Sequence, residues 1–399
     1  MRGPVLFHVQ YLLGIGHLQR SLRIAEALAD DGIPVTMVCG GPPVPLPRHA
    51  AIDFVQLPPI RARDARFELV DEAGEPIDDD FRAARREALL AAFHVARPEI
   101  VVIEGFPFAR RAFRFELEPL IAAARSARPQ PRLVCSVRDI VVVRPEPERH
   151  RRIVDDVRRD FDAVLVHGDA NFVPLDASFP AAPAIADRLV YTGYVCPPPD
   201  TAEAPPVADS DEIIVSAGGG AAGYALLQAA LAARRAGCLA AHPWLLLTGT
   251  NLPESDFAVL CATAPEGVTV ERFRPNLSAI LRSCRVSVSQ AGYNTVLDIL
   301  AAGARAVLVP FAAERETEQL VRAERLASFG AVELVREDEL SAQTLAAAIE
   351  RAASRSPPAI AIDTDGAVRS ARLIAAMLQS TDVAENLITD AARADIIER

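Results

Sequence analysis

The sequence has little that would mark a membrane-spanning, metal-binding or nucleic-acid-binding protein. No stretch approaches the roughly 18 consecutive apolar residues that a membrane-spanning helix needs. The six cysteines are scattered without a CxxC pair or another metal-type spacing, which is typical of thiols in a reducing compartment. The formal net charge is −11, from 42 basic and 53 acidic residues, so no basic excess is available for nucleic-acid phosphates. Since the start also lacks a signal-peptide pattern, we expect a cytoplasmic protein, free or peripheral at the inner membrane face, with no nucleic-acid partner.

Three ligand-binding motifs are also missing. The loop Gly14-Ile15-Gly16-His17 follows the first predicted strand but does not complete the GxGxxG pattern of dinucleotide-binding folds, and no GxxxxGK[ST] loop occurs. No DxD sequence stands at the end of a predicted strand. We therefore expect neither a bound cofactor nor a metal ion.

Short apolar runs alternate with longer helical patterns along the chain. Several runs are continuously apolar, as expected of parallel strands buried on both faces, and the alternation predicts doubly wound α/β sheets. In the first half we predict strands at 5–10, 34–39, 53–57, 100–105, 133–137, 163–166 and 189–191, and helices at 18–31, 79–96, 115–127 and 148–161. In the second half we predict strands at 212–216, 244–248, 268–273, 286–289, 306–310 and 332–335, and helices at 224–236, 277–283, 295–302, 316–329, 342–355 and 367–379.

A proline-rich stretch divides the two halves. It reads CPPPDTAEAPPVADSD, and its prolines, acids and small residues are typical of a stiff polar linker. We predict a Rossmann-like domain at 1–198, a linker at 199–211, a second such domain at 212–380 and a polar tail at 381–399. Two α/β domains of this kind are expected to face a central cleft, where the carboxyl ends of their sheets bind ligands.

The loop with Gly14 and Gly16 opens the first predicted helix. Glycines allow a tight turn, and the amides at a helix start can receive an anion. His17 then lies at the carboxyl end of the first strand and faces the cleft, which suits a general base that takes a proton from a hydroxyl. The alternative is a histidine that only caps or packs the helix, but the flanking glycine pair favours the functional interpretation.

A second glycine-rich turn, SAGGGAAG, follows the first strand of the second half. Gly218, Gly219 and Gly220 permit close approach of the backbone, so a diphosphate can lie against the amides at the start of the next helix. A flexible turn between strand and helix is an equally good interpretation.

The longest motif is VSVSQAGYNTVLDILAAGARAVLVPF. A strand ends at Ser289, a loop with Gly292 follows, and a helix begins near Asn294 or Thr295. Asp298 is expected in the first helical turn, where its carboxylate can accept hydrogen bonds from ribose hydroxyls. The structural alternative is a capping box, because Thr295-x-x-Asp298 has nearly that form and the helix dipole favours an acid in the first turn.

Glu318 and Gln319 follow this motif at the start of another predicted helix. Their side chains are suited to sugar hydroxyls. Taken by themselves, they are also what a solvated helix start contains.

Together these segments resemble the C-terminal domain of MurG-like GT-B glycosyltransferases of family 28. The shared pattern is a small loop (SQAGYNT), an acid-bearing helix (LDILAAG), a strand ending in VPF and an acid–Gln pair before a helix. The GHLQR loop, the GGG loop and the linker extend the resemblance over nearly the whole chain. It implies an α/β protein with the GT-B fold, in which two Rossmann-like doubly wound domains face a central cleft.

The resemblance implies a nucleotide-sugar donor site in the second domain. The ribose is expected on Asp298, where the family usually has Glu. The donor sugar is expected on Glu318 and Gln319, where two glutamines are common, so the acid indicates a different sugar. The diphosphate is expected near the glycines, and the base edge near the loop around Phe273. The predicted binding residues are Gly14, Gly16, Gly218, Gly219, Gly220, Phe273, Arg274, Ser289, Gly292, Asn294, Thr295, Asp298, Glu318 and Gln319.

The acceptor side has fewer recognisable features. Glu104 and Asp139 each follow a predicted strand and are further candidates for the catalytic base beside His17. The GxGHxxR loop also resembles UDP-sugar hydrolases of pseudaminic-acid synthesis, in which the histidine activates water. The segment FPFARRAFRF at 106–115 has two interpretations, contact with an anionic membrane surface or a half-buried helix start.

We therefore predict a hexosyltransferase that takes its sugar from a nucleotide sugar, a UDP-sugar first of all, inverts the anomeric carbon and needs no metal. The acceptor is a hydroxyl of a sugar, a lipid-linked sugar or a metabolite. The alternatives are a nucleotide-sugar hydrolase or epimerase with the GT-B fold, and a non-catalytic GT-B scaffold subunit.

Overall fold

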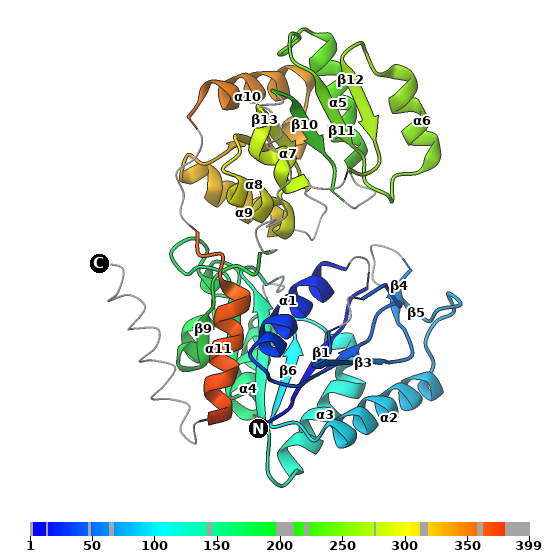
Figure 1. The fold of residues 1–399 in the computed structure, drawn as a ribbon, viewed down its shortest axis with the longest axis vertical. Coiled ribbons are helices and arrows are strands. Elements are labelled where there is room, and N and C mark those ends of the chain that lie inside the picture. The colour runs from blue at the N-terminus through cyan, green and yellow to red at the C-terminus, as the bar shows by residue number, and fades with distance from the viewer. Residues whose placement is uncertain are drawn as a thin grey trace. The chain divides into compact units, whose positions relative to one another are not determined.

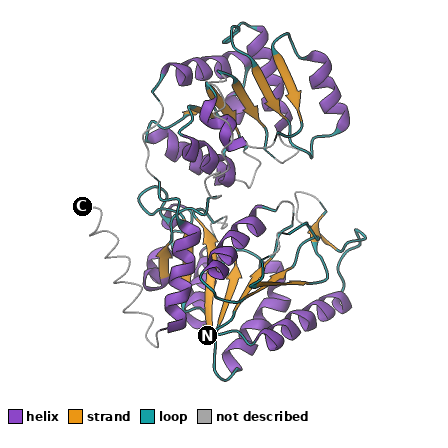
Figure 2. Cartoon of the chain, viewed as in Figure 1, coloured by secondary structure: helices purple, strands orange, loops and turns teal. Residues whose placement is uncertain are grey.

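The computed structural model describes residues 3–12, 15–46, 49–63, 68–141, 146–196, 211–218, 223–274, 277–311, 318–356 and 362–379. These residues form two compact α/β units (Figure 1). The first unit contains the described residues up to Val195 together with those from Asp363 onward, and the second lies within Cys196–Ile362. In each unit, helices flank a sheet on both faces (Figure 2).

The first unit is built on a parallel seven-stranded sheet of order β3-β2-β1-β6-β7-β8-β9. Its strands are rich in β-branched and apolar residues, and β1, β6 and β8 are buried along their whole length, as expected of a sheet covered on both faces. The strands are β1 (Val5–Val9), β2 (Val35–Cys39), β3 (Ile52–Gln56), β6 (Ile100–Glu104), β7 (Arg132–Arg138), β8 (Ala163–His167) and β9 (Leu189–Tyr191). A separate antiparallel pair is formed by β4 (Arg61–Ala62) and β5 (Leu69–Val70).

Two hydrophobic cores lie on the two faces of this sheet. One core packs α2 (Asp79–Ala96), α3 (Arg114–Ser126) and α4 (Pro147–Asp160) against the strands. The other packs α1 (Gly16–Asp30) together with α11 (Gly366–Gln379), which comes from the far end of the chain. Short 3-10 turns complete the unit at Arg111–Phe113, Leu175–Ala177 and Ala182–Arg188.

The second unit has a parallel six-stranded sheet of order β12-β11-β10-β13-β14-β15. Its strands are β10 (Ile213–Ser216), β11 (Trp244–Leu247), β12 (Val268–Glu271), β13 (Val286–Ser289), β14 (Ala306–Leu308) and β15 (Glu333–Leu334). Its helices are α5 (Tyr224–Arg235), α6 (Glu254–Thr263), α7 (Leu277–Ser283), α8 (Tyr293–Ala302), α9 (Glu318–Ser328) and α10 (Ala342–Ser354), with a 3-10 turn at Glu337–Glu339. A core beneath α5 and α10 holds this sheet.

The strands and helices predicted from the sequence are confirmed, and their ends differ by about two residues at most. The helix α6 was not predicted, because its apolar residues form one continuous run instead of recurring every third or fourth position. Only Leu260 of this helix is buried. The predicted linker lies almost wholly outside the described residues, as do residues 381–399.

The position of α11 corrects the predicted boundary of the second domain at residue 380. This helix packs on α1, and Leu373, Ile374 and Met377 enter the core of the first unit. An isolated bridge between Val195 and Asp365 brings the end of the first segment beside the returning chain. The amphipathic pattern predicts a helix with a buried face but does not indicate which core that face enters. None of the helices in the described ranges is long and apolar enough to cross a membrane.

Candidate functional site

The first unit has its topological switch point between β1 and β6. The sheet extends from β1 through β2 and β3 in one direction and from β6 onward in the other. Open α/β sheets bind ligands beyond the carboxyl ends of the strands at such a point. The loop after β1 leads to His17, and β6 ends at Glu104, so two predicted catalytic residues meet here.

His17 and Glu104 form a direct pair. The Nδ1 atom of His17 lies 2.7 Å from Oε1 of Glu104, although 87 positions separate them in the sequence. The Glu104 side chain is 1% exposed and the His17 side chain is 26% exposed. An ionised carboxylate can only accept, so Nδ1 carries the proton and the lone pair of the neutral ring is on Nε2. This tautomer has the form of an oriented general base.

Two arginines also bind the carboxylate of Glu104. Arg20 of α1 donates from Nη2 to the same Oε1 atom at 2.6 Å, and Arg110 donates to Oε2 at 3.3 Å. His17 and Arg20 are three positions apart on one helix, a spacing that places both side chains on one face. The predicted GHLQR loop therefore supplies two of the partners that position one buried carboxylate.

The charges around this pair determine its protonation. Burial raises the pKa of Glu104, but attraction to His17 and Arg110 outweighs burial, so the pKa lies well below its ordinary range. Burial lowers the pKa of His17 to about 4; Glu104 raises this pKa, whereas Arg110 and Arg138 lower it further. At neutral pH the pair is a carboxylate beside a neutral imidazole.

Asp139, the third predicted base candidate, directly follows β7 at the same edge of the sheet. It is buried, and its carboxylate accepts hydrogen bonds from the backbone N–H of Ile140 (2.9 Å) and the hydroxyl of Tyr194 (3.2 Å). These contacts are those of a side chain that orders its loop. Its role as a base stays a prediction.

The aromatic segment after β6 is part of the core. Phe106, Phe108 and Phe113 are buried, and the guanidinium of Arg114 lies over the ring of Phe106. Of the two interpretations of this segment, burial at a helix start agrees with the structure, and these three rings are not available to a membrane surface.

The second unit has its own switch point, between β10 and β13. The loop after β10 contains Gly218, whose φ of 68° is a left-handed conformation that favours glycine. A Cβ at Gly218 would lie 3.9 Å from Oε1 of Gln290 in the loop after β13, so the two predicted binding loops are neighbours. Ser289, at the end of β13, is buried, and its hydroxyl makes no hydrogen bond among the described residues.

The start of α8 overturns the capping-box alternative. The helix begins at Tyr293, its N-cap is Gly292, and no side chain caps it. Thr295 and Asp298 are therefore the third and sixth helical residues, so the prediction that Asp298 lies in the first turn was also wrong. Without a side-chain cap, the amides near Asn294 remain a suitable place for an anion.

Glu318 and Gln319 open α9, and Gln319 contacts the loop after β13. Gln319 uses Oε1 to accept from the backbone N–H of Ala291 (3.0 Å) and of Phe311 (3.1 Å). Both partners are donors, which orients the amide and identifies its NH2 group as the group suited to a ligand oxygen. Glu318 is 3% exposed and pairs with Arg322. The solvated-helix alternative is thus wrong for Glu318.

The loop predicted to hold the base follows β12. Phe273 is 70% exposed, an unusual position for a large apolar side chain. Arg274 pairs with Glu271, its hydrogen-bonding partner at 2.9 Å from Nε. Phe273 therefore offers an accessible ring, whereas the guanidinium beside it already has a carboxylate partner.

Three predicted glycines, Gly14, Gly219 and Gly220, lie outside the described residues. Gly16 is the first residue of α1, directly before His17. Among the residues that the structure describes, no three His, Cys, Asp or Glu side chains are grouped so that they could hold a metal ion.

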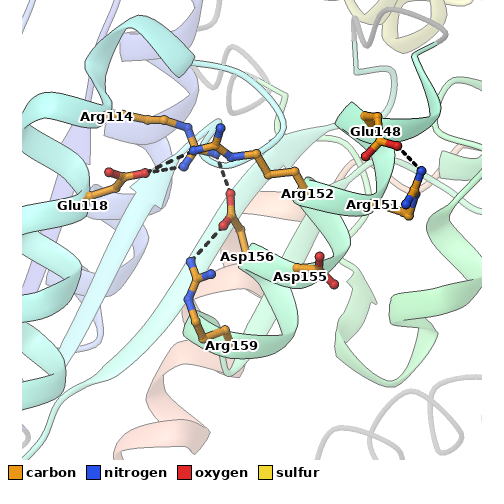
Figure 3. Close-up of a pocket in the computed structure, with 8 residues that line it drawn as sticks. All are labelled: Arg114, Glu118, Glu148, Arg151, Arg152, Asp155, Asp156 and Arg159. Atoms are coloured by element: carbon orange, nitrogen blue, oxygen red, sulfur yellow. Dashed lines mark hydrogen bonds and ion pairs between the residues drawn. The ribbon is translucent and has the colours of Figure 1, made fainter.

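A polar surface pocket of about 330 Å³ is lined by residues of α3 and α4 (Figure 3). Four arginines and four carboxylates line it: Arg114, Glu118, Glu148, Arg151, Arg152, Asp155, Asp156 and Arg159. Arg114 pairs with Glu118 and Asp156, and Arg151 with Glu148. Because the opposite charges balance one another, we interpret this pocket as a surface ion-pair network.

Sequence reasoning missed another buried arginine, Arg85 of α2. Its guanidinium donates to Glu116 (Nε–Oε2, 2.5 Å), to Oε1 of Gln10 (2.5 Å) and to the carbonyl of Gly40 (2.9 Å), as well as to that of Pro58. These contacts tie together the segments after β1, β2 and β3. No local pattern marks such a residue, because its partners come from distant parts of the chain.

Comparison with known proteins gives the following matches. Residues 214–375 match the glycosyltransferase family 28 C-terminal domain. The UDP-N-acetylglucosamine–N-acetylmuramyl-(pentapeptide) pyrophosphoryl-undecaprenol N-acetylglucosamine transferase of Phenylobacterium zucineum (strain HLK1) is 27% identical over 304 residues, which cover 70% of this chain and 80% of that protein. The protein of the same name from Lactiplantibacillus plantarum is 33% identical over 107 residues, 27% of this chain and 30% of that protein.

Solved structures show the same fold over the whole chain. The calicheamicin glycosyltransferase CalG4 matches with a TM-score of 0.59 at 20% identity, covering 100% of this chain and 98% of that one. MurG of Acinetobacter baumannii matches with a TM-score of 0.53 at 15% identity, covering 94% and 99%. At these identities the structural matches establish the two-unit architecture.

Proposed function

We propose that this chain, which has the GT-B fold and a C-terminal half that matches glycosyltransferase family 28, is a MurG-like enzyme that moves a hexosyl group from a nucleotide sugar to an acceptor hydroxyl. The first candidate donor is UDP-N-acetylglucosamine, the donor in the names of its curated relatives. The transfer inverts the anomeric carbon and needs no metal. The observation that carries the proposal is the His17–Glu104 pair at the switch point of the first sheet.

In this proposal His17 is the general base. Nε2 takes the proton of the acceptor hydroxyl while its oxygen attacks the anomeric carbon, and the bond from that carbon to the diphosphate oxygen breaks with its electron pair. Glu104 keeps the ring in the required tautomer and stabilises the imidazolium that forms. Since the pKa of His17 is about 4, the neutral base is present at any pH near 7.

The donor binds the second unit in this proposal. Backbone amides at the start of α8 and beside Gly218 receive the diphosphate, and they stabilise the charge that the leaving nucleotide gains. The support is an uncapped helix start beside a buried, unpartnered Ser289 hydroxyl among the described residues. Asp298 accepts from the ribose, and the Gln319 NH2 group donates to a sugar oxygen.

The test has two steps. A thermal-shift screen with UDP-, GDP- and dTDP-sugars identifies the donor, because a ligand that binds the native state raises its melting temperature. Nucleotide release is then measured with and without lipid-linked and soluble sugar acceptors, beginning with the acceptor in the relatives' name. Release that depends on acceptor, survives EDTA and gives an inverted product supports the proposal.

Other outcomes identify the alternatives. Free sugar formed at full rate without acceptor identifies a hydrolase. A wild-type chain that binds no nucleotide sugar, together with a His17→Ala variant that keeps its cellular function, identifies a non-catalytic subunit.

A further inference from the structure

Both backbone polar groups of Ala291 are bound by side chains from the first two turns of α9. Its N–H donates to Oε1 of Gln319 at 3.0 Å, and its carbonyl accepts from Nη1 of Arg322 at 3.0 Å. Ala291 itself is fully buried. It lies between Ser289, the last residue of β13, and Gly292, the N-cap of α8, so holding its backbone holds the segment that leads into the first amides of α8.

Arg322 is an unusual residue for this position. Its side chain is 1% exposed, and its guanidinium lies 5.5 Å from the centroid of the Tyr293 ring. Burying a guanidinium costs free energy that an apolar side chain of similar volume would not cost. The planar fork, however, can donate to a carbonyl and a carboxylate at once, which neither an apolar residue nor a lysine does in the same geometry.

Glu318 supplies the carboxylate in this arrangement. Its Oε1 atom lies 2.8 Å from Nη2 of Arg322, one helical turn away. A buried acid at this position therefore has a role that does not involve the donor sugar. That the acid indicates a different sugar stays a prediction beside this ion pair.

We propose that Arg322 and Glu318 are positioning residues of the donor site. They act by fixing the backbone of Ala291 and, through it, the diphosphate-binding loop. Glu318 neutralises and orients Arg322, Arg322 holds the loop carbonyl, and Gln319 holds the loop N–H. This inference rests on the proposed function, because the loop is a donor site only if the second unit binds a nucleotide sugar.

The experiment compares nucleotide affinity with fold stability in the full-length chain. Dissociation constants for UDP and UDP-N-acetylglucosamine are measured by calorimetry well below each variant's melting temperature, and folding is checked by circular dichroism. The variants are Arg322→Gln, Arg322→Lys and Glu318→Gln. The control is Arg351→Gln, which removes an exposed arginine of α10 that is paired with a glutamate (Glu333, 2.8 Å) in the same unit.

Arg322→Gln is expected to weaken UDP binding about tenfold or more, since a misplaced loop costs a factor of that order. Arg322→Lys keeps the charge beside Glu318 but loses the fork, so it is expected to fold and still to bind about tenfold more weakly. Glu318→Gln keeps an oxygen for Arg322 but removes its counter-charge, so it is expected to weaken UDP binding less than Arg322→Gln does and to bind more weakly than the wild type. Arg351→Gln is expected to leave affinity within about twofold.

Two results would overturn the inference in different ways. If folded Arg322→Gln and Arg322→Lys bind UDP as the wild type does, the pair only stabilises α9. If the wild type itself binds neither UDP nor UDP-N-acetylglucosamine, the proposed function fails and the positioning role fails with it.

Discussion

Replacing Glu104 by Gln tests the oriented base most directly. The carboxylate is 1% exposed and faces three donors, at 2.7 Å from His17, 2.6 Å from Arg20 and 3.3 Å from Arg110. The amide keeps one oxygen, which can still accept from His17 and Arg20. Its NH2 group replaces Oε2 and faces Arg110, so that bond is lost together with the negative charge.

The cost in stability follows from the two buried arginines that lose their counter-charge. Removing one partner of a buried ion pair costs about 3–5 kcal/mol, and the retained oxygen favours the lower end of that range. A domain of this size loses about 2–4 °C of melting temperature per kcal/mol. We therefore expect Glu104→Gln to melt roughly 6–12 °C lower and to remain folded at 25 °C.

The cost in rate follows from the charge that Glu104 contributes to the imidazolium. Because its negative charge raises the pKa of His17, the substitution lowers that pKa below its value of about 4 and weakens the base. General-base catalysis contributes about 10²–10⁴ in rate, so we expect kcat to fall at least a hundredfold. The variant with both Glu104→Gln and His17→Ala should be no slower than His17→Ala alone, because the two residues act as a unit.

The assay is nucleotide release with saturating donor and the acceptor that the wild-type chain uses. Glu116→Gln is the matched control, because Glu116 is equally buried and pairs with Arg85 in the same unit. It should lower the melting temperature by a similar amount and leave kcat nearly unchanged. A folded Glu104→Gln variant with kcat within threefold of the wild type would refute the role of Glu104.

Three further predictions concern nucleotide binding, packing and pH. Asp298→Asn should weaken UDP binding about 10–100-fold by calorimetry, since hydrogen bonds to a charged group contribute about 1.5–3 kcal/mol; unchanged affinity would remove Asp298 from the site. Gly40→Ala should lower the melting temperature, because its Cβ would lie 2.3 Å from Nη2 of Arg85; a neutral result would mean that the network can shift. The pKa of His17 is about 4 in the folded chain and 6.5 in the unfolded chain. Between these pH values the unfolded chain binds more protons, so the free energy of unfolding should fall as pH drops from 6.5 to 4. Denaturant titrations should show a smaller fall in that free energy for His17→Gln.

Much of the fold could be predicted because its elements have local causes. The run IVVI at 100–103 is apolar throughout, which is typical of a parallel strand buried on both faces. The carboxyl ends of such strands meet at one edge, so placing His17 and Glu104 at the same edge needed only the strand–helix alternation. The donor motif could be found because the order and spacing of its parts, not any one residue, distinguish it from an ordinary helix start.

What could not be predicted depends on contacts between distant parts of the chain. Arg20 and Glu104 are 84 positions apart, and Arg322 and Ala291 are 31 apart. A buried arginine looks like any charged helix residue until its carboxylate or carbonyl partner is located. The apolar face of α11 packs in the core of the first unit. Amphipathicity predicts that this face is buried, but it does not indicate which of the two units buries it. The helix α8 begins at Tyr293 with Gly292 as its N-cap, and glycine is an acceptable N-cap; the sequence alone did not distinguish this start from one capped by Thr295.

The GxGHxxR spacing now has a physical explanation that bears on transfer and hydrolysis alike. His17 and Arg20 lie one turn apart on α1, and both reach the single carboxylate of Glu104. The motif therefore builds a neutral imidazole in a fixed tautomer beside a carboxylate held by arginine. Such a base can accept a proton from water or from a sugar hydroxyl, so the resemblance of this loop to that of hydrolases does not by itself favour hydrolysis. Selection between the two reactions must come from the acceptor that reaches Nε2 and from the exclusion of water there. The acceptor dependence of nucleotide release measures that selection.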